Sequence, residues 1–386
     1  MGMETDSLGS YDIAVVGGGV MGCSTALPLA EAGLKVAVFD RRGLCLEASG
    51  RNAGSLSPMI KKAELVAHAM EGYHMWMSSK DWLGIDIGAH SKSGLIVAYN
   101  EVEANALKQL VANRRENGGQ IKLISGDRAC EIEPGLSSGV VLAAFSKLDG
   151  HGESNRTGQV FNVALKRAGA DIFSHCEVQR VIKKMNHFEL HTDKGIAYSK
   201  KIILAGGAWL ERMASWLGFR LPVQYKVNQM IVTERSPSLV RNVLGVQNGL
   251  LTLKQASNGT IVIGGGWQGH GDLEKGAWHI EPEAVIKNLQ IARHVIPQIK
   301  NLRVVRAWLG LEAILPDYLP AVGAVPGVTG AYIIGCCRGG WAIGPCLGSL
   351  LANFILGRPL KLPIFDPGRK IDAPPFLAAG SGLKGM

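Results

Sequence analysis

The segment Gly17-Gly18-Gly19-Val20-Met21-Gly22 constrains the fold more than any other feature of the chain. It has the spacing G-x-G-x-x-G, follows an apolar run at residues 11–16 and opens an apolar helical pattern at 20–32. In a Rossmann-type α/β unit such glycines permit a tight turn and let the backbone approach a pyrophosphate. The segment therefore predicts a dinucleotide-binding unit at the start of the chain.

An acidic residue stands where such a unit needs one. Asp40 ends the next predicted strand, where a carboxylate binds ribose hydroxyls. The pair Arg41-Arg42 follows it and keeps a 2′-phosphate, and therefore NADP, open as an alternative. The predicted dinucleotide contacts are Gly17, Gly19, Gly22, Asp40 and Arg41.

Glycine is in excess, with 50 of 386 residues, and it recurs in clusters far from this first segment. Glycine and proline together make about 17%, below the ~25–30% typical of low-complexity chains. A hydrophobic content of 47% with 19% charged residues is typical of a folded α/β protein with buried strands. The clusters at 206–207 and 335–348 each follow a short apolar strand pattern. The excess glycine therefore predicts further points of close backbone approach.

The remaining pattern predicts two interleaved architectures. Alternating strands at 178–199, 221–233, 250–253 and 260–263 indicate antiparallel sheet. Helices are expected at 63–82, 101–117, 281–295 and 345–356. The Pro- and Gly-rich end of the chain, residues 373–386, is expected to be a loose tail.

Four further motifs, in order along the chain, resemble those of the FAD-dependent amine and amino-acid oxidoreductases, the family of glycine oxidase, sarcosine oxidase and D-amino-acid dehydrogenases. They are Ser49-Gly50-Arg51-Asn52-Ala53-Gly54, then Ile203-Leu204-Ala205-Gly206-Gly207-Ala208-Trp209, then Arg306-Ala307-Trp308-Leu309-Gly310 with residues 316–323, and finally 335–348. The resemblance covers about residues 11–370 and implies FAD as the cofactor.

The same resemblance implies the fold class: α/β, a Rossmann-type FAD-binding domain with an inserted antiparallel-sheet α+β substrate domain. We expect the FAD-binding domain at 1–85, 150–215 and 318–372, and the substrate domain at 86–149 and 216–317. It also implies further cofactor contacts, which are Ser49, Arg51, Asn52, Ala53, Gly54, Ala205, Gly206, Trp209, Gly335, Arg338, Gly339, Gly340, Trp341 and Ala342. The helix expected near Pro345 would point its positive end at the flavin pyrimidine.

One position departs from the glycine-oxidase pattern. In those relatives an arginine that clamps the substrate carboxylate follows the glycine-hydrophobe pair, whereas Glu312 follows Gly310-Leu311 here. A glutamate in this place resembles the branch that contains the flavin subunits of opine oxidase and of hydrogen cyanide synthase. Glu312 either binds a cationic amine or guanidinium, or supports the flavin loop. Arg338 becomes the candidate for the carboxylate, against a structural arginine.

Candidate residues on the substrate sheet carry weaker signals. Trp267 is predicted to be a catalytic-site residue, and Tyr225, Lys254 and Gln268 are alternatives on the same sheet. The pair Lys61-Lys62 would meet a second cofactor or an electron-transfer partner, but a solvated charge pair is the favoured interpretation. Cys336 and Cys337 are the thiols nearest to the flavin in sequence; buried free cysteine is favoured over a covalent flavin link.

The expected function is oxidation of a secondary amine or amino acid, such as an opine, an N-substituted or a cyclic amino acid. A hydride passes from the carbon beside nitrogen to flavin N5. By resemblance, the chain would be the flavin subunit of a hetero-oligomeric dehydrogenase, with a second flavin or an iron–sulfur cluster on or shared with partner subunits. The alternatives are a stand-alone oxidase that makes hydrogen peroxide, and a flavin-binding protein that has lost turnover.

The sequence gives little support to other classes of protein. A formal charge of +9 comes from scattered basic pairs without aromatic interleaving, so no nucleic-acid partner is expected. Seven cysteines without a CxxC pair predict neither a disulfide framework nor a metal site, and we expect a reducing, cytoplasmic location. The uncharged stretch 339–356 contains glycines and a proline and is interpreted as a buried loop and helix, not a membrane span.

Overall fold

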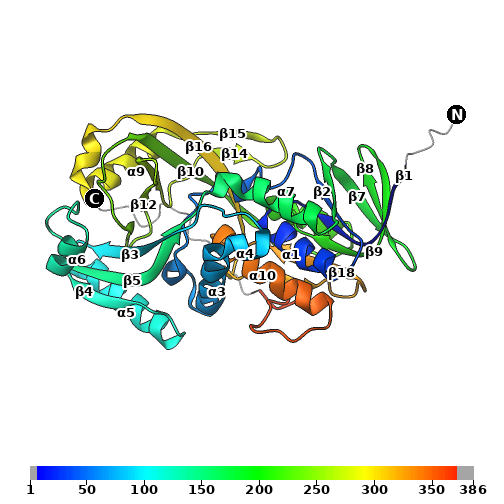
Figure 1. Cartoon of the computed structure of the whole chain (residues 1–386). Helices are drawn as coiled ribbons and strands as arrows, with labels where there is room; N and C mark the ends of the chain where they lie inside the picture. The colour runs from blue at the N-terminus through cyan, green and yellow to red at the C-terminus, as the bar shows by residue number, and fades with distance from the viewer. Residues whose placement is uncertain (1–6, 372–386) are drawn as a thin grey trace.

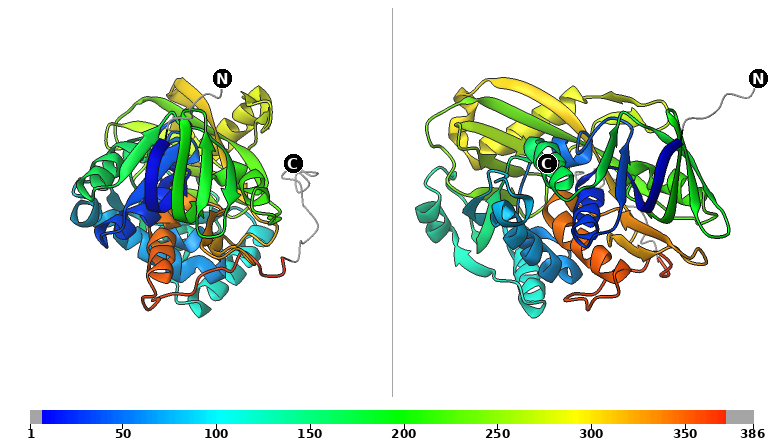
Figure 2. Two further views of the ribbon diagram at one scale, coloured as in Figure 1. Left: turned by 90° about the vertical axis from the view of Figure 1, so that its right-hand side faces the viewer. Right: turned by 45° about the vertical axis from the view of Figure 1, so that its right-hand side comes forward.

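The structure is a computed structural model that describes residues 7–371. Two eight-stranded sheets lie at opposite ends of the molecule, with helices packed around and between them (Figure 1). The first sheet lies on the right of Figure 1 and the second on the left; a rotated view in Figure 2 separates them more clearly. The predicted tail at 373–386 lies outside the described residues.

The first sheet is built around the strand that precedes the glycine segment. Its strands are β1 (Ser7–Val16), β2 (Val36–Asp40), β6 (Asp171–Ser174), β7 (Val178–Lys183), β8 (Phe188–Thr192), β9 (Gly195–Leu204), β17 (Ala321–Ala324) and β18 (Ala331–Gly335). Their order is β17-β18-β9-β1-β2-β6, and β7 and β8 continue from β9 as an antiparallel meander. The pairs β18–β9, β9–β1, β1–β2 and β2–β6 are parallel, as a Rossmann-type unit requires.

Both faces of this sheet are covered, which explains the uninterrupted apolar sequence of its strands. Ile13 and Val15 pack with helices α1 (Val20–Glu31), α7 (Thr157–Arg167) and α10 (Gly340–Ile355). Ala14 and Val16 point to the other face and pack with the β7–β8 meander. Because successive strand residues point to opposite faces, all four are buried.

Helix α10 begins earlier than its proline suggests. The sequence pattern favours a start near Pro345, since proline is common in a first helical turn. The helix instead begins at Gly340 and carries Pro345 inside it. A proline there cannot bond to the carbonyl four residues earlier, that of Trp341. The indole N–H of Trp76 donates to this carbonyl at 2.9 Å, so the lost helical bond is replaced.

The helix expected at 63–82 is interrupted. The structure has a 3₁₀ turn η2 (Ala63–Leu65), then α3 (Val66–Met77) and α4 (Ser79–Leu83). Ser78 separates the last two, and its hydroxyl donates to the His74 carbonyl at 3.0 Å. Such bonding of a serine to the preceding turn competes with helix continuation, which accounts for the break.

The second sheet has the strand order β16-β10-β13-β12-β11-β3-β5-β4. These strands are β3 (His90–Ala98), β4 (Lys122–Ser125), β5 (Leu142–His151), β10 (Gln224–Arg235), β11 (Val243–Val246), β12 (Thr252–Gln255), β13 (Thr260–Gly264) and β16 (Val304–Ile314). Pairing is antiparallel except between β11 and β3, which run parallel. This pair differs from the antiparallel pairing expected for the sheet, and it lies where two separate chain segments join. The other elements are α2 (Ala48–Arg51), α5 (Glu101–Glu116), α6 (Gly126–Ile132), α8 (Leu210–Ser215), α9 (Pro282–Val295), the hairpin β14 (His270–Asp272) and β15 (Ala277–His279), and short 3₁₀ turns.

Strands of the first sheet come from residues 7–40, 171–204 and 321–335, and strands of the second come from 90–151 and 224–314. The two sheets thus alternate along the chain in the order that the predicted segments have. Strand β5 runs two residues past the boundary expected at 149/150. The division into two domains with those boundaries stays a prediction.

Candidate active site

A large cleft lies against both sheets. Its volume is about 1400 Å³, above the ~300–1,000 Å³ typical of pockets for small ligands. The carboxyl ends of β1, β2, β9 and β18 open into it, and from the second sheet β3, β10 and β16 contribute lining residues. In parallel α/β sheets ligands bind outside the carboxyl ends of the strands. The cleft has room for a dinucleotide and a further small molecule.

The first glycine segment forms one end of the cleft. Gly17 has φ +111°, a conformation that suits glycine, and a Cβ there would overlap the Ala205 carbonyl. The Asp40 carboxylate accepts main-chain N–H bonds from Gly18 at 2.8 Å and from Arg42 and Gly43 at 2.9 Å each. A carboxylate has about four acceptor positions, so one is left for a ribose hydroxyl.

Arg41 and Trp209 meet at the same end. The guanidinium carbon of Arg41 lies 3.9 Å from the centre of the Trp209 ring, and both residues line the cleft. Arg41 and Arg42 both bond to Glu47, at 3.3 and 3.0 Å. Their charge is therefore partly neutralised within the protein, which weakens the case for a 2′-phosphate.

The loop after α2 is held in shape by its own side chain. The Asn52 amide accepts from the Gly54 N–H at 2.7 Å and donates to the carbonyls of Ala48 and Ser49 at 3.0 and 2.8 Å. The Trp308 indole N–H donates to the Arg51 carbonyl at 2.7 Å, which ties this loop to β16. Asn52 and Trp308 thus position the loop, in addition to any contact with a ligand.

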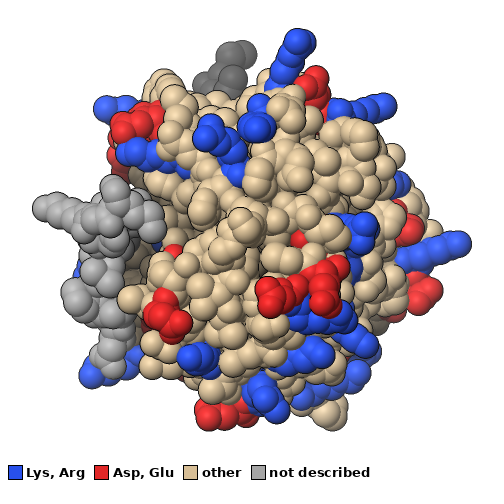
Figure 3. All heavy atoms as spheres, turned by 90° about the vertical axis from the view of Figure 1, so that its left-hand side faces the viewer, with Lys and Arg blue, Asp and Glu red and all other residues tan. Residues whose placement is uncertain are grey.

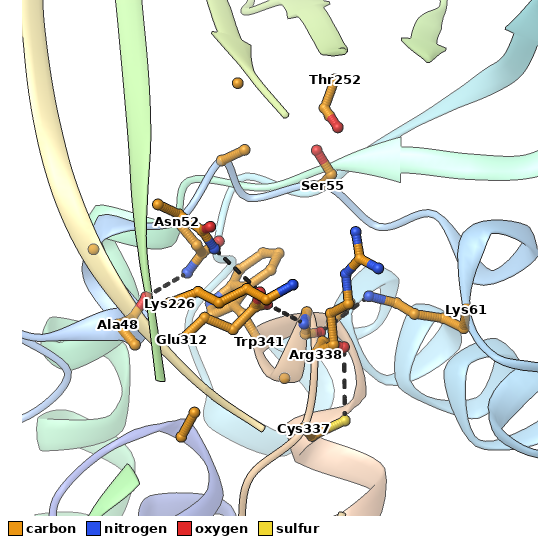
Figure 4. A pocket seen from close by; sticks show the side chains of 18 of the residues that line it. Ala48, Asn52, Ser55, Lys61, Lys226, Thr252, Glu312, Cys337, Arg338 and Trp341 are labelled. Carbon is orange, nitrogen blue, oxygen red and sulfur yellow. Dashed lines mark hydrogen bonds between the residues drawn. The ribbon is translucent and has the colours of Figure 1, made fainter. Parts of the chain in front are cut away.

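Glu312 holds the loop at the start of α10. Its Oε1 accepts the Gly339 N–H at 2.6 Å, and its Oε2 accepts an N–H of the Asn228 amide at 3.1 Å. The Asn228 carbonyl oxygen in turn accepts from the Gln268 amide at 2.8 Å. These contacts favour the role of Glu312 as a support for the loop over a role in binding a cationic group (Figure 4).

Lys61 is buried in the cleft wall, unlike the solvated charge pair that the sequence favours. This lysine is only 9% exposed, lines the cleft and donates to the Gly339 carbonyl at 3.2 Å. Burial lowers the pKa of its ammonium group. Lys62, its neighbour, is exposed and pairs with Glu64 at 2.9 Å. The favoured interpretation of both as a solvated pair is therefore wrong for Lys61; no local signal distinguishes the two.

Two further buried ionisable groups, Asp149 and Lys254, interact electrostatically with each other. Burial raises the pKa of Asp149 to about 7, while its carboxylate accepts the Ser57 hydroxyl at 2.7 Å. Burial also lowers the pKa of Lys254 to about 7, and its ammonium donates to the Ala53 carbonyl in the loop after α2. Asp149 lines the cleft, so it places a titratable group in the cleft wall.

The two adjacent cysteines are buried thiols. Burial raises the pKa of Cys337 to about 12 and also raises that of Cys336. The Cys337 thiol donates to the Arg338 carbonyl at 3.7 Å. Neither sulfur is ionised at neutral pH, which disfavours its reaction as a nucleophile.

Most of the predicted site residues are brought together in the cleft. Those that line it are Gly17, Gly19, Asp40, Arg41, Ser49, Arg51, Asn52, Ala53, Ala205, Gly206, Trp209, Glu312, Gly335, Arg338, Gly339, Gly340, Trp341 and Ala342. Gly22 and Gly54 are not among the lining residues. A Cβ at Gly22 would overlap the Gly17 carbonyl, and one at Gly54 would overlap the Gly152 carbonyl, so both serve local packing.

The predicted catalytic-site residue Trp267 is also outside the lining, which corrects its proposed place. Its indole N–H donates to the Leu250 carbonyl at 3.1 Å, within the second sheet's own loops. The next residue, Gln268, lines the cleft instead and forms a bridge with Asn228 on β10. Since neighbouring residues in extended chain point opposite ways, the side chain one position along enters the site.

Within residues 7–371, no cluster of three or more His, Cys, Asp or Glu side chains is arranged to hold a metal ion. No helix in the same range is long and apolar enough to cross a membrane. On the face in Figure 3, Lys and Arg side chains are spread over the surface, and several of them lie beside Asp or Glu.

The parallel sheet, the glycine turn and the cleft at the carboxyl ends of the strands together define a dinucleotide-binding protein of the Rossmann type. A sequence profile of the FAD dependent oxidoreductase family DAO matches residues 12–354, and the chain belongs to this family. Its members act on amino acids and amines with FAD as cofactor.

Similar proteins cover nearly the whole chain. Glycine oxidase of Geobacillus kaustophilus is 27% identical over 355 residues, covering 89% of this chain and 93% of that protein. An opine oxidase subunit of Rhizobium meliloti is 26% identical over 346 residues, covering 85% and 89%. The crystal structure of the Geobacillus glycine oxidase superposes with a TM-score of 0.87 at 24% identity, covering 94% of this chain and all of that one, and shows the shared fold.

The residues of the cleft fit FAD. The glycine segment and the amino end of α1 accommodate a pyrophosphate, and Asp40 retains an acceptor for a ribose. The amino end of α10, with Gly339 and Gly340, lines the other part of the cleft. The expectation of FAD as cofactor is confirmed by the family to which the chain belongs.

Proposed function

We propose that the chain oxidises a secondary amine of amino-acid type, such as an opine, an N-substituted or a cyclic amino acid. The observation that carries the proposal is the arrangement of Glu312 and Arg338. Both Glu312 oxygens bond inside the protein, whereas the Arg338 side chain extends into the cavity in Figure 4. Arg338 therefore takes the carboxylate, and no clamping arginine is needed at position 312.

FAD, when bound, supplies the acceptor for a hydride from the carbon beside the amine nitrogen. The protein's part is to hold the substrate in place and to keep its nitrogen uncharged. Arg338 binds the carboxylate, and Glu312 keeps the loop that carries Arg338 in position through Gly339. Asp149, with its raised pKa, lies in the cleft wall as a group able to take up the amine proton near neutral pH.

We further propose that the chain works as the flavin subunit of a hetero-oligomeric dehydrogenase. Its support is the similarity to a protein named as a subunit of opine oxidase, together with the glutamate at position 312. The competing function is a stand-alone oxidase that passes electrons to oxygen, which the similarity to glycine oxidase favours. The two differ in the electron acceptor, not in the oxidised bond.

Anaerobic titration of the purified FAD-loaded chain tests both proposals. Opines, sarcosine, D-amino acids and hydroxyproline are added in turn, and the flavin's visible absorbance is followed. A secondary amine should bleach the flavin, and an artificial dye should reoxidise it much faster than air does. Fast, stoichiometric peroxide formation by the isolated chain would overturn the hetero-oligomer proposal, and an unbleached flavin with every amine would overturn the substrate proposal.

A further inference from the structure

Cationic side chains outnumber free carboxylates in the part of the cleft around Arg338, where the substrate is proposed to bind. Lys61, Lys226 and Arg338 line it, and within the described residues none of the three has a carboxylate oxygen within 4.0 Å. Figure 4 shows them extending into the same part of the cavity from three different elements. Lys61 and Arg338 are close enough to act on each other electrostatically.

The nearest carboxylate does not neutralise this group fully. Glu312 lies opposite Lys226 in the β10–β16 ladder, but its two oxygens accept from Gly339 and Asn228. Three cationic side chains therefore stand against one carboxylate in this group. Asp149 also lines the cleft, and buried Lys254 beside it has the opposite sign, so these two residues leave the excess of cations unchanged.

Lys226 faces the cleft because every second side chain of a β-strand points to the same side. Lys226, Asn228 and Met230 alternate along β10 and line the cleft, whereas Val227 and Gln229 between them do not. The Lys226 ammonium lies 5.6 Å from the centre of the Tyr318 ring, a weak contact that leaves its hydrogen-bond donors available.

We propose that Lys226 is a specificity-determining residue that binds a second carboxylate, so that the preferred substrates are secondary amines bearing two carboxylates. This inference rests on the proposed amine oxidation. Arg338 takes one carboxylate and Lys226 the other, on either side of the nitrogen. A dicarboxylate with an uncharged amine carries two negative charges, which matches the excess positive charge beside an oxidised, uncharged isoalloxazine ring.

Iminodiacetate and its monoamide provide a matched pair of probes, since they have the same shape and differ by one charge. Hydrogen bonds to charged groups contribute about 1.5–3 kcal/mol, so the holoenzyme should bind iminodiacetate roughly 10- to 150-fold more tightly than the monoamide. Kd is measured by calorimetry and from the shift of the flavin spectrum, and kcat/KM by dye reduction. Lys226→Met should reduce this ratio to below about threefold, and Lys226→Arg should retain most of it.

Lys183→Met is the control, because Lys183 also lies over an aromatic ring, at 4.3 Å from Phe188, but outside the cleft lining. It should keep the wild-type ratio. Equal binding of the two probes by the wild-type protein, or an unchanged ratio in Lys226→Met, would overturn the inference. If no amine bleaches the flavin while calorimetry still shows the preference, the proposed oxidation fails and the second carboxylate site stands.

Discussion

Replacing Glu312 by glutamine should weaken FAD binding although the side chain keeps its shape. The Gly339 N–H would lose a bond to a charged acceptor, worth about 1.5–3 kcal/mol, and gain a neutral one worth about 0.5–1.5 kcal/mol. The new amide N–H₂ would face the Asn228 N–H₂, donor against donor. Turning the Asn228 amide would only pass the conflict to Gln268, whose N–H₂ now donates to Asn228 at 2.8 Å and to the Gly266 carbonyl at 3.3 Å.

The net cost is about 2 kcal/mol, once one weakened and one lost bond are combined. If the loop at Gly339 must be reordered when FAD binds, the whole cost appears as a dissociation constant raised by roughly 30-fold. Fluorescence titration of the apoprotein with FAD measures it. Glu234→Gln is the matched control, since Glu234 accepts the Arg303 N–H at 2.9 Å at the opposite end of β10. An FAD affinity within about twofold of wild type in Glu312→Gln, with a selective loss of amine binding, would refute the supporting role and favour direct contact with substrate.

Three further changes have defined outcomes. Gly17→Ala should abolish FAD binding in the same titration, because of its φ of +111° and the overlap with the Ala205 carbonyl; retained yellow colour after purification would contradict this. The pKa of Asp149 is raised to about 7, so its contribution to the free energy of unfolding is fully present below about pH 4. This contribution is lost as pH rises to about 7, and the free energy of unfolding then falls by up to ~1.4 kcal/mol per pH unit. The pKa of Lys254 is lowered to about 7, so the free energy of unfolding rises with pH above about pH 7. The urea midpoint of the wild type should therefore pass through a minimum near pH 7. Asp149→Asn should remove the fall of the midpoint on the acid side of this minimum. Trp76→Phe should destabilise the protein by about 1–3 kcal/mol in urea, because a buried carbonyl of α10 loses its donor, whereas an unchanged midpoint would show that water replaces it.

The parts of the site that the sequence predicts well are those fixed by neighbouring residues. A strand, a glycine turn and a helix follow one another within 7–31, and the conformations that they need are encoded locally. Asp40 is likewise placed by the end of its own strand. The order of the later glycine segments adds the family, and with it FAD.

Side-chain direction in the second sheet is less predictable. Trp267 and Gln268 are adjacent and equally plausible in sequence, yet only Gln268 enters the cleft. Which of two neighbours points inward depends on the pairing of Asn228 with Gln268, a register set by strands distant in sequence. The same alternation of side chains along β10 makes Lys226, and not the aromatic Tyr225, face the cleft.

Lys61 shows why the remaining part escapes prediction. It stands beside Lys62 in a polar stretch, and a lysine is rarely buried without a partner. Its partner is the Gly339 carbonyl, 278 residues further along the chain, on the same loop whose N–H bonds to Glu312. One peptide segment thus receives a cation at its carbonyl and an anion at its N–H, and both charges are brought there by long-range packing. A fixed orientation of this segment is what a cofactor loop at the start of α10 requires, and the contacts of Lys61 and Glu312 with Gly339 supply it.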